Sequence, residues 1–477
     1  MANISEAVKI RREVLKELAK KAYDGTLKDT VRDILYTVVT DDGPRHRCCI
    51  YRERSILEER VHLALSQPMD IPLELAAAQA LQGEIVKGPV MSMLPSACDR
   101  CLADKFMVTD ACRNCLAHHC IVSCPKNAIF IVRNRAYIDR EKCCSCGRCK
   151  TACSYSAIVE IKHPCEHACE VQAITAAPNK KAVIDHEKCV ACGACKIACP
   201  FGAIGDRSVL VQVIRTLKKR RTYAMLAPSF IGQFGVKVTA AQVVAALRKA
   251  GFYAVAEVSV GADWVIAREA AEFTEQVPAS KPFMTSSCCP AFVGMIKKHA
   301  KEYEEHLSTT VSPMVALARL LKEKDPGAVT VFIGPCIAKK AEALAYPADV
   351  DFVLTFEEAE ALLTGADLQA AMMPGEAMGS QATANGNLFA IAGGVAQAVA
   401  QAVQAQEGEV TVTACQSEGL EACQLMLKQL KKGELTANFM EGMACSGGCS
   451  GGPGTMNDVR VTQRLVKNFS QKARCGS

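Results

Sequence analysis

The fold of this chain is decided by the stretch CCSCGRCKTAC (residues 143–153) and by its near copy CVACGACKIACP (residues 189–200). Both stretches contain the spacing C-x2-C-x2-C-x3-C, and each follows a single upstream cysteine, Cys124 or Cys169. The cysteines of the first copy recur in the second with a shift of 45 or 46 residues. A repeat of this length predicts a duplicated supersecondary unit.

The spacing resembles the cysteine run of bacterial ferredoxins with two [4Fe–4S] clusters, in which the fourth cysteine binds the other cluster. The reason is geometric: three thiolates on one tight loop reach three corners of a cubane, and the fourth corner faces away. Zinc is the alternative metal, but structural zinc sites usually pair two C-x2-C turns. The spacing therefore favours iron–sulfur clusters.

This crossover rule predicts three clusters. The predicted ligand sets are Cys124, Cys143, Cys146 and Cys149; Cys112, Cys115, Cys120 and Cys153; and Cys169, Cys189, Cys192 and Cys195. The gap before Cys120 is longer than usual. The second repeat lacks counterparts of Cys112 and Cys115, because Ile158 and Ile161 stand there.

A fourth cluster is predicted from the cysteines that remain in this region, which are Cys98, Cys101, Cys165 and Cys199. The chain must return across more than 60 residues to bring Cys98 and Cys101 to the other two. His163 or His167 could serve as a ligand instead. Four clusters so close in sequence predict an electron-transfer chain, and a purely structural role is the alternative.

Composition supports metal binding inside a reducing compartment. The chain has 27 cysteines in 477 residues, and such numbers in a large chain favour metal ligation over disulfides. Half of the residues are hydrophobic and 22% are charged, which excludes dominant disorder. The net charge of +6 is too small and too diffuse to predict nucleic-acid binding. Because no signal peptide or apolar membrane span is visible, we expect no membrane partner and a cytoplasmic location.

Three domains are expected. Residues 1–90 have helical periodicity and read as a helical cap, or else as a partner-docking region. Residues 91–210 form the ferredoxin-like part, and residues 222–477 alternate strands and amphipathic helices, which predicts α/β units on mainly parallel sheets. The basic run at 218–221 is expected to be a solvated linker, with a docking patch for an acidic electron carrier as the alternative.

Four further cysteines lie in three well-separated motifs of the second half. The motifs are TSSCCPAF (residues 285–292), GPCIAKKAE (334–342) and EGMACSGGCSGG (441–452). Only folding can bring these thiolates together. The glycines around Cys445 and Cys449 permit close approach to a bulky group.

These motifs resemble those of the [FeFe]-hydrogenase catalytic domain. The resemblance covers roughly residues 222–465 and implies two α/β lobes with the metal cluster in the cleft between them. It implies that an H-cluster is present, a [4Fe–4S] cluster joined to a diiron subsite with CO, cyanide and azadithiolate. The implied cubane ligands are Cys289, Cys336, Cys445 and Cys449.

The resemblance also implies roles for other side chains. Lys339 and Ser229, beside Pro228, would hydrogen-bond cyanide, and Met443 would pack against the diiron unit. Protons would pass along Cys288, Glu269, Ser308 and Glu272. A thiol suits this use because its ordinary pKa of about 8.5 lets it give and take a proton at modest cost.

The motifs also depart from the usual family residues. The departures are Gly334, Met314, Phe292 and Ser446, with Ser287 as an added residue before the cysteine pair. They surround the expected diiron site, where burial and hydrogen bonding tune reactivity. We expect them to affect rate, catalytic bias and oxygen sensitivity rather than the reaction class. Cys48, Cys49, Cys144, Cys415, Cys423 and Cys475 have no predicted role, although Cys415 and Cys423 are expected in the core.

The sequence therefore predicts α+β ferredoxin-like [4Fe–4S] repeats followed by a two-lobed α/β catalytic domain that interconverts H2 with two protons and two electrons. Ferredoxin is the expected carrier, since no dinucleotide-binding G-x-G-x-x-G follows a strand. Maturation proteins are expected to supply the diiron subsite. A hydrogen sensor and a hydrogenase-like iron–sulfur assembly protein remain the alternatives.

Overall fold

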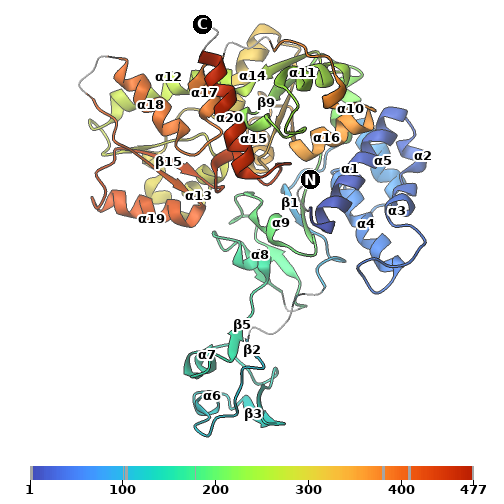
Figure 1. Ribbon diagram of the computed structural model, residues 1–477, viewed down its shortest axis with the longest axis vertical. Coiled ribbons are helices and arrows are strands. Elements are labelled where there is room, and N and C mark those ends of the chain that lie inside the picture. The colour runs from blue at the N-terminus through green and yellow to red at the C-terminus, as the bar shows by residue number, and fades with distance from the viewer. Residues whose placement is uncertain are drawn as a thin grey trace.

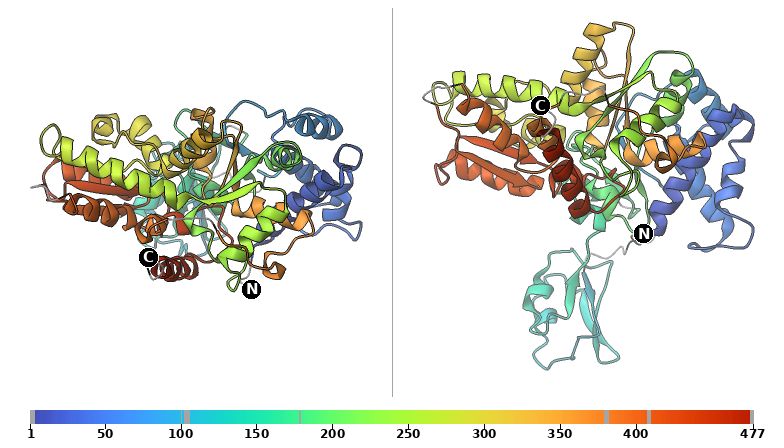
Figure 2. Two further views of the ribbon diagram at one scale, coloured as in Figure 1. Left: turned by 90° about the horizontal axis from the view of Figure 1, so that it is seen from above. Right: turned by 45° about the horizontal axis from the view of Figure 1, so that its top comes forward.

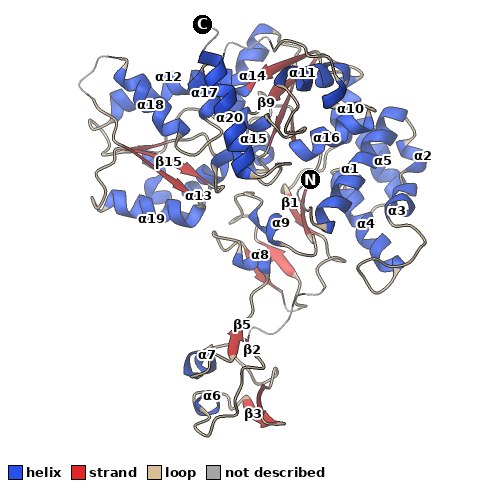
Figure 3. Ribbon diagram, viewed as in Figure 1, coloured by secondary structure: helices blue, strands red, loops and turns tan. Residues whose placement is uncertain are grey.

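The computed structural model describes residues 4–99, 101, 106–177, 179–378, 382–406 and 410–474. Figure 1 shows helices of the N-terminal region beside a large α/β body, with a smaller lobe projecting from it. Figure 3 shows that strands occur in the body and the lobe and that the N-terminal part is helical. Cys475 lies outside the described residues.

The N-terminal region consists of five helices: α1 (Glu6–Asp24), α2 (Leu27–Thr30), α3 (Asp33–Val38), α4 (Ile50–Ala64) and α5 (Leu73–Gln82). Helix α1 buries Val14, Leu15 and Leu18 on one face, as helical spacing requires. It ends at Gly25, whose φ of +77° is the left-handed conformation that favours glycine.

The ferredoxin-like region is two copies of one small module. The outer module pairs β2 (Phe106–Val108) with β5 (Ile158–Glu160), pairs β3 (Ile129–Val132) with β4 (Arg135–Ile138), and adds α6 (His119–Val122) and α7 (Arg148–Ala152). The inner module pairs β1 (Met91–Met93) with β8 (Ile204–Asp206), pairs β6 (Ile174–Ala176) with β7 (Ala182–Ile184), and adds α8 (Pro164–His167) and α9 (Ala194–Ala198).

The inner module is discontinuous in sequence. Its first strand, β1, precedes the whole outer module, and its other strands follow it. The outer module is therefore inserted into the inner one. Figure 2 shows the outer module as the lobe that extends from the body, with the inner module between them.

The second half contains two separate parallel sheets, as the alternation of strands and helices predicted. One sheet has the order β10 (Ala254–Glu257), β9 (Thr222–Leu226), β12 (Val329–Gly334), β13 (Phe352–Thr355); the other has β11 (Met284–Thr285), β15 (Phe439–Met443), β14 (Ala414–Glu418). Strands β12 and β15 are buried along their whole length, because each lies inside its sheet and helices cover the faces.

Helices surround both sheets. They are α10 (Leu210–Leu217), α11 (Ala240–Lys249), α12 (Val258–Gln276), α13 (Pro290–His299), α14 (Pro313–Lys324), α15 (Ala338–Ala345), α16 (Phe356–Gly365), α17 (Ala384–Leu388), α18 (Gly394–Gln404), α19 (Leu420–Lys431) and α20 (Val459–Arg474). Thr239 caps α11 in a reciprocal capping box with Gln242.

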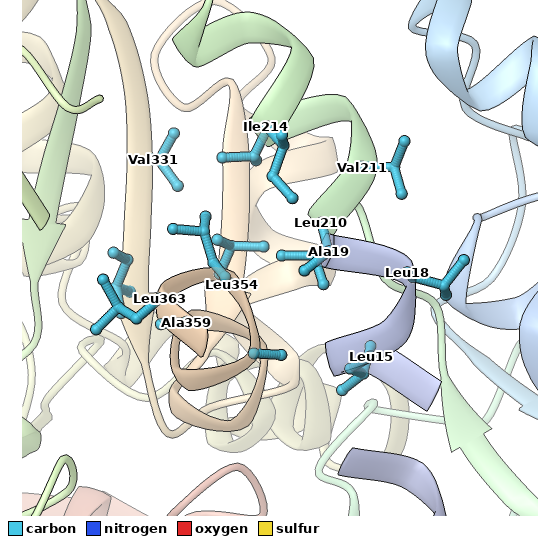
Figure 4. Close-up of a cluster of buried hydrophobic side chains, with 14 of the residues drawn as sticks. Leu15, Leu18, Ala19, Leu210, Val211, Ile214, Val331, Leu354, Ala359 and Leu363 are labelled. Carbon is cyan, nitrogen blue, oxygen red and sulfur yellow. The ribbon is translucent and has the colours of Figure 1, made fainter. Parts of the chain in front are cut away.

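The N-terminal helices share a core with the first sheet. Figure 4 shows Leu15, Leu18 and Ala19 of α1 near side chains of α10 and α16 in one apolar cluster. Gly365 permits close approach, since a Cβ there would lie 2.5 Å from Ala19 Cβ. Residues 6–24 are thus part of the body's main hydrophobic core.

The basic run at 218–221 lies at the end of α10. Lys218 Nζ donates to the backbone oxygens of Ala22 (3.1 Å) and Tyr23 (2.9 Å) near the end of α1, and Arg221 lies over the Tyr253 ring. These contacts favour the linker interpretation of the run. In the described part of the chain, we find no helix with the length and apolar character needed to span a bilayer.

Candidate functional site

The three cysteine motifs of the second half all follow parallel strands. Cys289 comes after β11 and directly precedes α13, and Cys336 comes after β12. Cys445 and Cys449 come after β15, the latter in a short 3-10 turn (Gly448–Gly451). Ligand sites in α/β folds form outside the carboxyl ends of parallel strands. Two sheets contribute such ends here, so the motifs meet between the lobes.

One cavity brings these motifs together. Its lining includes Cys288, Cys289, Cys336, Cys445 and Cys449. It also includes Lys339, Pro228 and Met443, and among the positions that depart from the family, Met314. The remaining lining is almost wholly apolar.

The electrostatics of the thiols confirm their proximity. Burial raises the pKa of Cys449 to about 12, and the nearby Cys289 thiol adds to the effect. Burial also raises the pKa of Cys445 well above its ordinary value, with further contributions from Cys336 and Cys289. Ionising four neighbouring buried thiols in the absence of a cation would cost free energy. Iron ions bound to the thiolates would offset that cost.

The donor set fits an iron–sulfur cluster joined to a further group. Four thiols surround an apolar space, and beside them the Ser229 hydroxyl is buried with no hydrogen-bond partner among the described residues. Lys339 Nζ is buried, binds Glu342 Oε2 at 2.6 Å and donates to the Cys288 backbone oxygen at 3.3 Å. A bound polar group would satisfy the Ser229 hydroxyl.

The carboxylates of the expected proton route lie on one face of α12. Glu269 is fully buried, and burial raises its pKa to about 7. Its Oε1 accepts from the Ser287 backbone N–H (3.1 Å) and hydroxyl (3.3 Å), while its Oε2 has no partner among the described residues. The extra residue, Ser287, is therefore the one that holds Glu269.

Ser308 lies beside the two carboxylates. Its hydroxyl donates to Glu272 Oε2 at 2.7 Å, and the residue lies close to Glu269. The Thr309 backbone N–H binds both Glu272 oxygens, at 3.0 and 3.1 Å. Cys288 is close enough to Glu269 that the carboxylate raises its pKa, together with burial. The structure thus brings Cys288, Glu269, Ser308 and Glu272 into one series.

Sequence reasoning missed Glu441, the first residue of the third motif. It is completely buried and accepts from the backbone N–H groups of Gly393 (2.9 Å) and Ala396 (2.8 Å) at the start of α18. Burial raises its pKa to about 7, and it lies near Cys288. The only feature of the sequence that could have indicated Glu441 is its position at the start of the third motif.

Three of the four predicted sets gather in full, and the remaining set gathers without Cys146, which is exposed and interacts with Cys144 instead. Cys120 lies near Cys112, Cys115 and Cys153; Cys149 near Cys143 and Cys124; Cys195 near Cys192, Cys189 and Cys169; and Cys165 near Cys199, Cys101 and Cys98. The fourth set thus gathers despite the long separation in sequence. His163 is buried, and neither it nor His167 is among the charged neighbours of Cys165.

Backbone hydrogen bonds show how the fourth set arises. In the outer module, the Ala136 N–H donates to Cys112 Sγ at 3.5 Å, and in the inner module the Ala182 N–H donates to Cys98 Sγ at 3.3 Å. Ala136 and Ala182 are equivalent positions of the repeat. Cys98 therefore takes the place of Cys112, on the segment after β1, which the inserted module separates from the rest of the inner module.

The inner module touches the cavity. Cys445 lies near Cys192 of the inner module. A Cβ on Gly193 would lie 2.8 Å from Pro453 Cγ and 2.9 Å from Ile337 Cδ1, next to Cys336. This close contact places the Cys169/189/192/195 set beside the site. Cys195 of this set in turn lies near Cys165 of the fourth set.

Comparison with known proteins agrees with this arrangement. Residues 220–453 match the family described as "Iron only hydrogenase large subunit, C-terminal domain", and residues 182–205 match "4Fe-4S binding domain". Iron hydrogenase 1 of Clostridium pasteurianum is 29% identical over 373 residues, covering 66% of this chain and 64% of that protein. The chain therefore spans less than two thirds of that relative.

Two other relatives are informative. The periplasmic [Fe] hydrogenase large subunit of Nitratidesulfovibrio vulgaris is 29% identical over 328 residues, which cover 56% of this chain and 78% of that protein. The cytosolic Fe-S cluster assembly factor NAR1 of Kluyveromyces lactis is 34% identical over 100 residues, covering 20% of this chain and 21% of that protein.

Proposed function

We propose that this chain, whose residues 220–453 match the model of iron-only hydrogenase C-terminal domains, interconverts H2 with two protons and two electrons. The observation that carries the proposal is one apolar cavity lined by five thiols and a buried lysine from three distant motifs. Cys289, Cys336, Cys445 and Cys449 would hold the H-cluster, which supplies the metal chemistry of H2 cleavage and formation.

The remaining residues serve positioning and proton transfer. Lys339 and Ser229 would hydrogen-bond the diatomic ligands, and Met443 would pack against the diiron unit. Pro228 lines the cavity beside Ser229, and the apolar lining keeps water out. Exclusion of water strengthens every electrostatic interaction inside such a site.

Protons would move between the cavity and solvent through Cys288, Glu269, Ser308 and Glu272. Glu269 suits the relay because a pKa of about 7 lets it hold or release a proton near neutral pH. The Ser308 hydroxyl, already bound to Glu272, can pass a proton between the carboxylates. Glu272 is 8% exposed and so is the member of this pair that reaches the surface.

Electrons would move one at a time through four [4Fe–4S] clusters. The inner module's Cys169/189/192/195 set adjoins the cavity, and the outer module is the most distant part of the series (Figure 1). Residues 106–160 contain eight lysines and arginines against four aspartates and glutamates. A groove beside Cys143, lined by Arg133, Arg140 and Tyr137, would suit an acidic carrier such as ferredoxin.

The assembly-factor alternative rests on the similarity to NAR1 over 100 residues. The hydrogenase and the hydrogen sensor both need the diiron subsite, whereas an assembly factor does not. Cys288 and the complete third motif favour the subsite. The expected need for maturation proteins and the expected cytoplasmic location both remain predictions.

Infrared spectroscopy decides among these functions. The full chain is produced without oxygen together with hydrogenase maturation proteins, and its spectrum is recorded alongside H2 uptake and evolution. We expect CO and cyanide bands together with turnover. Absence of the bands, with iron of about twenty atoms per chain, would support the assembly function. Bands without turnover would support the sensor.

A further inference from the structure

The N-terminal helical region holds the chain segment that carries Cys98. Both carboxylate oxygens of Glu59 accept from the Ser96 backbone N–H, at 3.0 and 3.1 Å. Arg52 donates to the Ser96 oxygen at 2.7 Å. Arg47, just before α4, donates to the Ala97 oxygen at 3.2 Å and pairs with Asp99 at 2.6 Å.

The same region also holds the loop after Cys199. Arg60 Nη2 donates to the Phe201 oxygen at 3.3 Å, and the Arg47 guanidinium lies 5.5 Å from the centre of the Phe201 ring. A Cβ on Gly202 would lie 2.9 Å from Arg60 Nη2. One face of α4 and its preceding loop therefore joins the two sequence-distant halves of the Cys98/101/165/199 set.

Arg60 brings a positive charge that no carboxylate of the described residues neutralises directly. Within the described ranges, Arg47 and Arg52 form ion pairs with Asp99, whereas Arg60 forms none. Burial, with repulsion from Arg11 and Arg47, lowers the pKa of Arg60 to about 10, so the guanidinium is still charged at neutral pH. The Cys199 thiol is its principal attractive neighbour.

The equivalent set in the outer module lacks this cover. Figure 1 places that module away from the N-terminal helices. The neighbouring Arg135 is paired with Asp110 at 2.5 Å. Backbone N–H groups bind the equivalent sulfurs in both modules, at Cys112 and Cys98. The two sets thus share their local hydrogen bonds and differ in the helical cover and its charge.

We propose that the N-terminal helical region is a cover for the [4Fe–4S] cluster of Cys98, Cys101, Cys165 and Cys199, and that Arg60 raises the reduction potential of this cluster. Reduction adds one electron to an already anionic cluster, and a buried positive charge stabilises the added electron. The proposal rests on the ligand assignment given above but does not depend on hydrogen turnover.

The test is a redox titration of the full chain reconstituted with iron and sulfide, with dithionite as the electron donor and electron paramagnetic resonance as the readout. In Arg60→Met we expect one accessory cluster to shift to a more negative midpoint potential. Arg60→Lys keeps the charge and should shift it less. Glu59→Gln removes a nearby negative charge and should shift the same cluster to a more positive potential.

Arg32→Met is the matched control, because Arg32 is an exposed arginine of the same region paired with Glu74. We expect it to leave every midpoint unchanged. Unchanged midpoints in Arg60→Met with full iron content would overturn the proposal, as would equal shifts in Arg60→Met and Arg60→Lys. If Arg60→Met loses the cluster and Arg60→Lys keeps it, a charge requirement is supported. Loss of the cluster in both Arg60 variants would overturn the proposal. So would a Glu59→Gln variant in which the midpoint potential of this cluster is unchanged or more negative.

Discussion

At the residue scale, the cavity gathers the thiols that were expected, and carboxylates whose environment only the structure reveals lie near Cys288. Glu269 and Glu272 are three residues apart on a helix, where such pairs are usually solvent-facing, yet both are buried here. Ser287 looked like an added residue, yet its backbone N–H donates to Glu269 and its hydroxyl donates to the Thr310 backbone oxygen. Gly334 is explained by packing, since a Cβ there would lie 2.5 Å from the Phe332 ring.

Replacing Cys288 with alanine should lower H2 turnover by roughly 100-fold or more, because general acid–base groups contribute about that much. The CO and cyanide infrared bands should remain, since Cys288 is not a predicted ligand. Cys423→Ala is the control: Cys423 is also fully buried, but its thiol contacts the Ser417 and Met443 backbone oxygens instead of lining the cavity. Full turnover in Cys288→Ala would remove this thiol from the proton route.

Glu269 and Glu441 should both lose a proton near neutral pH. Burial raises each pKa from 4.5 to about 7, so infrared difference spectra should show two protonated carboxyl bands that vanish as pH rises through about 7. Glu269→Gln and Glu441→Gln should each remove one band. Because the folded-state pKa is the higher one, stability falls as pH rises from about 4.5 to 7, and each variant should weaken that dependence. Bands that persist at pH 9 would contradict this assignment.

At the element scale, the two repeats are the same structure in different surroundings. Gly147 and Gly193 are equivalent residues with φ of +79° and +83°, each directly before the short helix that carries the third cysteine of the run. Only Gly193 faces the catalytic region, at Pro453 and Ile337. Similar local sequence thus occurs in two different surroundings, which tertiary position determines.

Alanine at these two glycines should have unequal effects. Both substitutions place a side chain in the left-handed region, at a cost of about 1–2 kcal/mol. Gly193→Ala should lower the free energy of unfolding further and slow the reduction of the accessory clusters under H2, followed by rapid-freeze paramagnetic resonance. Gly147→Ala would meet only the Phe106 ring, 3.2 Å away, and should keep the wild-type rate. Equal rates in the two variants would contradict the contact's role in electron transfer.

At the scale of the whole molecule, one ferredoxin-like module interrupts another, and the N-terminal helices, inner module and catalytic lobes share buried contacts. Asp206 at the end of β8 binds both Lys196 (2.6 Å) and Lys340 (2.7 Å). Glu357 of α16 forms an ion pair with Arg11 of α1 at 2.7 Å. These ions join all three regions, and removing one partner would leave a buried charge without compensation.

Excising the outer module should leave the remainder of the chain folded. Its ends lie together, because Phe106 and Glu160 are paired in the β2–β5 ladder. Replacing residues 106–160 by a short Gly-Ser linker should remove about eight iron atoms and preserve H2 turnover with a small-molecule dye. Turnover with ferredoxin should fall strongly. A variant that loses about twelve iron atoms would show that the inner module depends on the outer one.

The sequence by itself predicted the chemistry. Cysteine spacing predicts local cluster loops, and three motifs resemble those of a known catalytic domain, because each motif consists of residues close together in the chain. It also predicted the alternating α/β elements of the second half. Only the tertiary structure decided that Glu441 lies near Cys288 and that the N-terminal region holds both the segment of Cys98 and the loop after Cys199. These relations join residues far apart in sequence, and long-range packing, which leaves no periodic or local signal, brings them together.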